Sequence, residues 1–175
     1  MRSRLLAVCL CAALSACAQV QGPPPPPPPP AGPHGPPPTF HPQAFDWSAQ
    51  RGSASIRGET AYGHGFSCAG QPVVLTPDTP YSRWRIVELY GSADHAALPV
   101  AEVRSRQAHR PSDEYSAYVR RTTCDPQGHF DFEGLPAGGW FVIAVTLPGG
   151  QGGQAMALMR RVQTRAGAVR SVVLD

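Results

Sequence analysis

The chain has 175 residues, including 21 prolines and 18 glycines, and charged residues make up only 15% of it. Its formal net charge is +3, and every basic residue other than histidine is an arginine; because these arginines are scattered, the sequence argues against nucleic-acid binding. Many prolines cluster between Pro23 and Pro38. The foldable part is therefore the region of roughly 130 residues from Phe45 onward, which is enough for one domain with its own core.

The N-terminus has the pattern of a targeting signal. The basic MRSR precedes the apolar run LLAVCLCAAL, which is too short to span a bilayer. The segment Leu14–Cys17 then resembles the lipobox of bacterial lipoproteins. This resemblance implies that residues 1–16 are removed and that Cys17 carries lipid that anchors the chain in a membrane. Ala18 stands where an aspartate commonly retains enterobacterial lipoproteins in the inner membrane, which implies the outer membrane, facing the periplasm or the cell surface. The alternative is an ordinary secretory peptide in which Cys17 is incidental.

Residues 17–44 form a predicted linker between this anchor and the domain. It contains eight consecutive prolines, Pro23–Pro30. Such a run adopts polyproline II, at about 3.1 Å per residue, because proline fixes φ and has no N–H to donate. We therefore expect a semi-rigid stalk that holds the domain away from the membrane.

Two cysteines remain for the domain. Cys9 and Cys11 leave with the signal, so that Cys68 and Cys124 are left in an oxidising compartment. We expect a disulfide between them. Two buried thiols or a metal pair are the alternatives, and a metal pair is disfavoured because neither cysteine lies in a C-x-x-C or near a histidine at ligand spacing.

The region after Ser53 has the pattern of short strands. Asp125-Pro126-Gln127-Gly128 is a type I turn, and Leu135–Gly138 is the next turn. Between these turns, Phe130 and Phe132 alternate with polar residues, as expected for a strand with one buried face. Seven strands are predicted, at 53–63, 71–77, 114–123, 129–133, 140–147, 156–164 and 168–174. The strand at 140–147 is apolar on both faces and should be central, and the set predicts an all-β sandwich.

One segment, at about 78–113, interrupts the strands. Thr79 can cap a helix, Pro80 suits its first position and Gly91 suits its end, which predicts a short helix. The residues from Asp94 to Pro111 then look like a long, mobile loop.

A motif follows the insertion: Thr122 and Asp125-x-x-Gly128-x-Phe130-x-Phe132-x-x-Leu135-Pro136-x-Gly138-x-Trp140. It resembles the signature of the carboxypeptidase regulatory-like domain, a transthyretin-type (prealbumin-like) sandwich. The resemblance covers residues 53–175 apart from the insertion, so we expect residues 45–175 to form a seven-stranded transthyretin-like sandwich with a short inserted helix and loop. It implies structural roles for these residues and says little about function, because the fold is a widely reused scaffold.

The residues do not assemble into a recognisable catalytic motif. The sequence has no H-x-x-E pair, G-x-S-x-G elbow or P-loop, and it ends SVVLD rather than in the tyrosine-arginine-glycine-serine tail of the transthyretin-like hydrolases. His129 and Glu133 share a strand face about 13 Å apart, too far to hold one metal ion. We therefore expect a protein that is not an enzyme and has no cofactor and no metal.

Binding is the remaining class of function, and the inserted helix carries a candidate patch. Its aromatic rings and guanidinium groups suit a glycan or a protein partner. The members of this predicted patch are Tyr81, Arg83, Trp84, Arg85 and Tyr90. The alternative is that these residues pin the helix to the sandwich, and the polar face of His129, Asp131 and Glu133 is expected to be only a solvated strand face.

The function predicted from the sequence is therefore that of a non-catalytic lipoprotein module that binds an envelope protein or a glycan. The alternatives are a structural spacer in an envelope assembly and a cryptic transthyretin-like hydrolase. An exposed aromatic and arginine patch would favour the module, an exposed strand edge the spacer, and a pocket with clustered histidine and carboxylates the hydrolase.

Overall fold

A computed structural model describes residues 37–106, 113–150 and 152–175. Cys17 and the run of eight prolines lie outside these residues. The helical elements are η1 (Pro42–Phe45), α1 (Asp46–Ala49), α2 (Pro80–Tyr90), α3 (Val100–Ser105) and α4 (Asp113–Ser116). The strands are β1 (Ala54–Thr60), β2 (Phe66–Ser67), β3 (Pro72–Pro77), β4 (His95–Pro99), β5 (Arg120–Thr123), β6 (His129–Leu135), β7 (Gly138–Pro148), β8 (Met156–Thr164) and β9 (Val169–Leu174).

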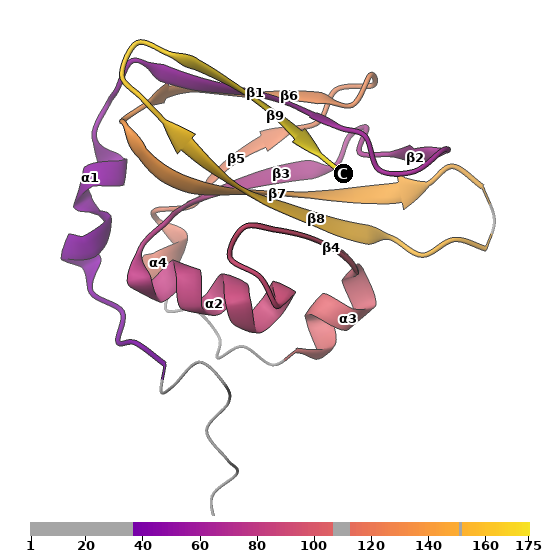
Figure 1. Ribbon diagram of the computed structural model, residues 1–175, viewed down its shortest axis with the longest axis horizontal. Coiled ribbons are helices and arrows are strands. Elements are labelled where there is room, and N and C mark those ends of the chain that lie inside the picture. The colour runs from indigo at the N-terminus through magenta and orange to yellow at the C-terminus, as the bar shows by residue number, and fades with distance from the viewer. Residues whose placement is uncertain (1–36, 107–112, 151) are drawn as a thin grey trace, which may run out of the picture. The chain divides into compact units, whose positions relative to one another are not determined.

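The strands form two packed sheets (Figure 1). The small sheet has the order β6-β1-β9, and the large sheet has the order β4-β8-β7-β3-β5, with β2 also paired to β7. Strand β1 is antiparallel to β6 but parallel to β9. The prediction of an all-β, sandwich-like fold is confirmed, whereas the described residues form nine strands rather than the expected seven. The two additional strands are β2, which is too short for a periodic pattern, and β4, which falls in the predicted loop.

The first core lies between the two sheets. Phe130 and Phe132 of β6 are 3% and 6% exposed, and Trp140 of β7 is fully buried. Strand β1 brings Gly58 opposite Phe130, and a Cβ atom on Gly58 would come within 2.0 Å of the Phe130 ring. The ring therefore occupies the space that a side chain at position 58 would need, and only glycine fits there without displacing it.

The second core lies on the other side of the large sheet, under α2 and α3. Ile86 and Tyr90, four residues apart on α2, share one helix face and pack with Phe141 of β7 and Met159 of β8. Strand β7 is thus covered on both faces, which explains its continuous apolar sequence. As predicted, Thr79 caps the start of α2, where its side chain accepts a hydrogen bond from the Ser82 N–H, and Gly91 caps its end in the left-handed conformation.

The expectation of a long loop at 94–111 is wrong for its first part. Residues 95–105 form β4 and α3, because β4 pairs with β8 and α3 packs on the second core. The third predicted strand also begins later than expected. Residues 113–116 are helical, and this turn brings the Tyr115 hydroxyl within 2.6 Å of the Thr76 Oγ1 atom. The remaining loop positions, 107–112, lie outside the described residues.

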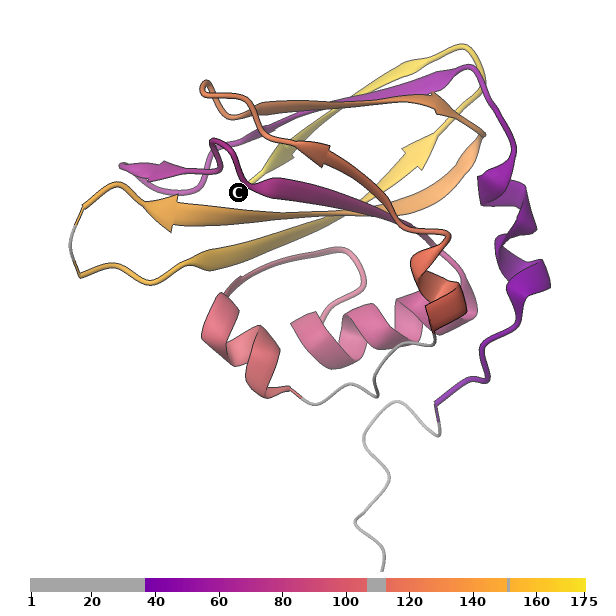
Figure 2. The same ribbon diagram turned by 180° about the vertical axis from the view of Figure 1, so that it is seen from behind.

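The packed region begins before Phe45. Phe45 is fully buried, and the Phe40 ring lies 5.3 Å from the Tyr81 ring of α2. Trp47 of α1 packs on Trp140 with the ring centroids 5.1 Å apart. In Figure 2, α1 follows one end of the two sheets. Residues 40–49 therefore belong to the domain, although the sequence predicted linker as far as residue 44.

No helix among the described residues is long and apolar enough to cross a membrane.

Replacing Gly58 with alanine tests the packing of Phe130. The added Cβ atom should force the Phe130 ring out of its position, at a cost of about 1–3 kcal/mol in the free energy of unfolding. Gly150→Ala is the control, because a Cβ atom there meets no other atom within 4 Å. Urea unfolding of both variants measures the effect, and equal stability of the two would contradict this account of the core.

Candidate functional site

The five residues of the predicted patch do not share one exposed surface. Arg85 and Tyr90 are each only 8% exposed. Tyr90 faces the large sheet, and burial raises the pKa of its hydroxyl to about 12. The Arg85 guanidinium lies 6.0 Å from the centre of the Tyr81 ring and 5.8 Å from that of Tyr115. Helix α2 lies along the large sheet, so Arg85 and Tyr90 are used for packing and are not presented to a partner.

The other members of the patch also have structural contacts. Arg83 is exposed, but its Nη2 atom lies 2.5 Å from Oδ2 of Asp78, and the Nε atom of Arg161 lies 2.6 Å from the same oxygen. The Asp78 side chain is 3% exposed, so these contacts tie the start of α2 to β8. Trp84 and Tyr81 are half-buried. The structure thus favours the alternative in which these residues pin the helix.

The small sheet, in contrast, carries polar side chains on its outer face. Since side chains alternate along a strand, burial of Phe130 and Phe132 directs their polar neighbours outward. A hollow of about 620 Å³, here called the first hollow, lies on this face. The residues that matter for its chemistry are Arg57, Glu59, Asp125, His129, Asp131 and Glu133.

Acidic and basic side chains lie close to one another in the first hollow. Arg57 of β1 is paired with Asp131 of β6, and the Arg57 Nε atom lies 3.7 Å from Asp131 Oδ1. His129 Nε2 lies 3.8 Å from Glu59 Oε2, and His129 Nδ1 lies 3.4 Å from Asp125 Oδ2. All these side chains are well exposed, and such pairs contribute little to stability. They can therefore exchange their partners for a ligand at low cost.

A rigid turn holds one end of the first hollow. The Gly128 N–H donates to the Asp125 carbonyl over 3.0 Å, which closes the predicted type I turn. The Asp125 Oδ1 atom accepts hydrogen bonds from the N–H groups of His129 (2.7 Å) and Gln127 (2.9 Å). These bonds, first that from His129, hold the pKa of the Asp125 carboxyl below its usual value.

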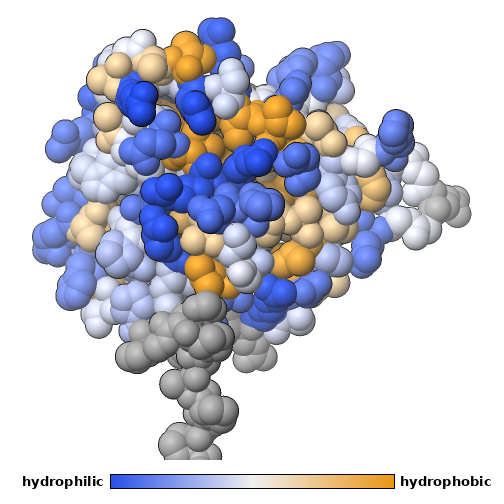
Figure 3. Space-filling view, in the orientation of Figure 1, coloured by the Kyte–Doolittle hydropathy of each residue, from blue (hydrophilic) through white to orange (hydrophobic). Residues whose placement is uncertain are grey.

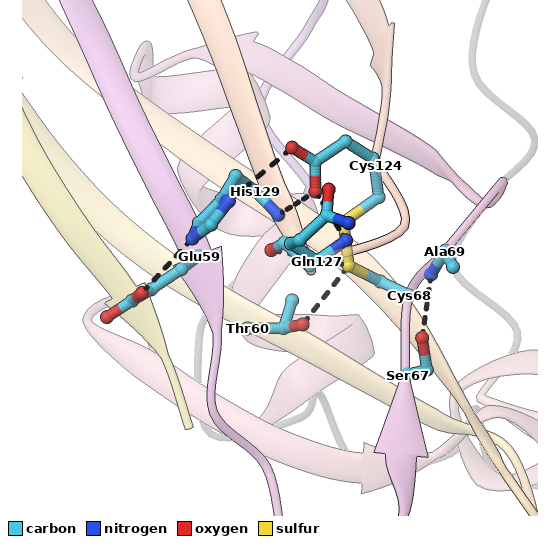
Figure 4. Close-up of a disulfide and its surroundings, with 10 residues drawn as sticks. Glu59, Thr60, Ser67, Cys68, Ala69, Cys124, Gln127 and His129 are labelled. Carbon is cyan, nitrogen blue, oxygen red and sulfur yellow. Dashed lines mark hydrogen bonds and ion pairs between the residues drawn. A yellow bond between two sulfur atoms is a disulfide. The ribbon is translucent and has the colours of Figure 1, made fainter.

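The Cys68–Cys124 disulfide lies next to this turn (Figure 4). It confirms the cysteine pairing expected from the sequence. The Thr60 hydroxyl at the end of β1 lies 3.1 Å from Cys68 Sγ, so the bridge also contacts the small sheet. Covalent and hydrogen bonds together position the turn that precedes His129.

The two ring nitrogens of His129 are not arranged as in a histidine-activated nucleophile. In a Ser-His-Asp triad, the histidine directs one ring nitrogen at an orienting carboxylate and the other at the nucleophile. Both ring nitrogens of His129 face carboxylates. Within the described ranges, no three histidine, cysteine, aspartate or glutamate side chains are placed to hold a metal ion.

No protein-family model and no curated protein matches this chain. Its fold is similar to the crystal structure of a Pseudomonas aeruginosa protein described as a "putative carbohydrate binding protein". The TM-score is 0.58, the sequence identity is 21%, and the likeness covers 78% of this chain and 97% of that chain. At this identity the likeness concerns the fold.

Sequence reasoning named His129, Asp131 and Glu133 together but interpreted them as a solvated strand face. It missed Arg57 and Glu59, because nothing local to β1 shows that it pairs with β6. The only available signal was the alternation within each strand, which places all five outward but does not bring them together.

Substitution of Asp125 tests the turn. A lowered pKa in the folded state means that the Asp125 carboxylate stabilises the protein above the unfolded pKa of about 4, and that this contribution is lost as the pH falls through the lowered folded value. Asp125→Asn keeps an acceptor oxygen but cannot ionise. We expect urea unfolding to show wild type more stable than the variant near pH 6, with the difference shrinking toward pH 2. A difference that does not vary with pH would contradict the assignment.

Proposed function

We propose that this chain is a non-catalytic binding module that holds a glycan on the outer face of the small sheet, β6-β1-β9. The observation that carries the proposal is that this face is hollowed and lined by exposed hydrogen-bonding groups, whereas α2 and α3 cover the outer face of the large sheet. The carbohydrate-binding description of the protein with a similar fold supports the choice of a glycan.

The chemistry of the face fits neighbouring hydroxyl groups of a sugar. Each hydroxyl both donates and accepts a hydrogen bond. In the first hollow, the Arg57 guanidinium can donate while the Asp131 and Glu59 carboxylates accept, and charged groups make the stronger hydrogen bonds. Val173, 37% exposed on the neighbouring strand, adds an apolar contact for a ring face.

The same proposal covers the setting of the module. Resemblance of residues 14–17 to a lipobox supports lipidation of Cys17 and attachment to the outer membrane, with the proline run as a stalk. The match of the Asp125–Trp140 motif supports membership of the carboxypeptidase regulatory-like domains, with a transthyretin-type sandwich. The partner is then a glycan of the cell envelope or one that reaches it.

Arg57→Ala and Asp131→Ala test the binding face. Each should weaken glycan binding about ten- to hundredfold, the loss expected for a hydrogen bond to a charged group. Both side chains are more than half exposed, so the melting temperature should not change. Arg104→Ala on α3 is the matched control, because it also removes an exposed arginine, but one on the other side of the molecule. The measurement is a glycan array followed by calorimetry on the full chain in detergent; binding that both variants retain would refute the assigned face.

Cys17→Ser tests the anchor. Without the thiol, no thioether to lipid can form, so palmitate labelling should be lost and the protein should leave the membrane fraction. Unchanged membrane retention of this variant would contradict the lipoprotein assignment, independently of any glycan result.

A further inference from the structure

A second hollow adjoins the first along β6. Its volume is about 560 Å³, and Arg51, Arg120 and Glu133 are among the residues that line it. Glu133 also lines the first hollow, so the two meet at this residue. We call the combined feature the groove. It runs beside β6, whose seven residues extend over roughly 20 Å at about 3.3 Å each.

Two glycines contribute only backbone to the lining of the second hollow. Gly52 and Gly134 both line it, and the N–H of Gly52 donates to the Gly134 carbonyl over 3.1 Å. A Cβ atom on Gly52 would come within 2.0 Å of the Leu135 carbonyl oxygen, so the backbone there approaches too closely for any other residue. Ala49 and Gln50 at the end of α1 form part of the wall.

The two ends of the groove carry opposite charges. In the first hollow, three carboxylates besides Glu133, those of Glu59, Asp125 and Asp131, accompany a single guanidinium, that of Arg57. The second hollow instead contains the guanidinium groups of Arg51 and Arg120.

Arg120 is held in place at the second hollow. Its Nη2 atom donates to the Ser48 carbonyl over 2.8 Å, and its guanidinium lies 5.6 Å from the centre of a Trp140 ring. Contacts within the fold therefore fix the position of one positive charge at this end of the groove.

This charge distribution discriminates between classes of polymer. A polymer with uniform negative charge is repelled by the carboxylates at one end, and a polymer with uniform positive charge is repelled by the arginines at the other. An uncharged polyhydroxyl chain can accept from the arginines and donate to the carboxylates along its whole length. Building on the proposed glycan-binding function, we infer that the ligand is an uncharged linear glycan of several sugar units that lies along β6 and occupies both hollows.

Ligand length provides the first test. The probes are neutral linear oligomers of glucose, mannose, xylose and N-acetylglucosamine, from one to six units, titrated against the full chain. Affinity should rise at least about tenfold between one and four units, because further units reach the second hollow at little extra cost in rigid-body entropy. Ala49→Trp should fill the second hollow and abolish this gain without changing the affinity for a single sugar. Ala117→Trp places the same side chain at an exposed site outside the groove and should behave as wild type. If Ala49→Trp melts at a lower temperature than wild type, Gln50→Trp is used in its place.

Ligand charge provides the second test. Galacturonate oligomers (anionic) and glucosamine oligomers (cationic) should bind wild type at least about tenfold more weakly than neutral oligomers of the same length. Arg51→Glu replaces one of the two positive charges of the second hollow with a negative one, so this variant should gain affinity for glucosamine oligomers.

The outcomes separate the two proposals. The inference is overturned if affinity does not depend on ligand length and Ala49→Trp does not alter it. It is also overturned if a charged oligomer series binds as tightly as the neutral series. Either result leaves the glycan-binding function standing. Wild type that binds no glycan of any class overturns both.

Discussion

The Cys68–Cys124 disulfide is the constraint on which the candidate site depends. It joins the segment that enters β3 to the end of β5, where the chain leaves the large sheet for the small one, across a sequence separation of 56 residues. Closing a loop of that size is worth roughly 4 kcal/mol in the chain-entropy model. Because Cys124 directly precedes the turn at Asp125, the bridge also fixes the point from which β6 starts and thus the end of the first hollow.

The second determining feature is the unequal covering of the two sheets. The inserted segment covers the outer face of the large sheet, where Ile86 and Tyr90 pack against β7 and β8. An element that looks like a binding insertion is thereby used to complete a second core. Figure 3 shows that hydrophilic residues cover most of the face seen from the side of Figure 1, with small apolar areas between them. The outer face of the small sheet keeps its polar side chains available, and function is proposed there for that reason.

The segment before β1 links these two features. Trp47 packs on Trp140, and the Ser48 carbonyl accepts the hydrogen bond from Arg120, so residues at the start of the predicted domain close one end of the sandwich. Helix α1, which contains Trp47 and Ser48, ends at Ala49 in the wall of the second hollow. The chain that leads into the domain therefore also shapes the proposed groove.

The sequence by itself determined the features that depend on neighbours in the chain. The helix from Pro80 to Tyr90, the turn at Asp125 and strand β8 follow from capping residues, turn residues and periodicity, and the remaining pair of cysteines indicated the disulfide. Only the tertiary structure decided which surfaces remain free. The pairing of Arg57 with Asp131, the parallel pairing of β1 with β9 and the burial of Arg85 depend on contacts between residues far apart in the sequence. Local periodicity shows which way a side chain points along its own strand or helix, but it does not encode the register of a distant strand or the element that will cover it.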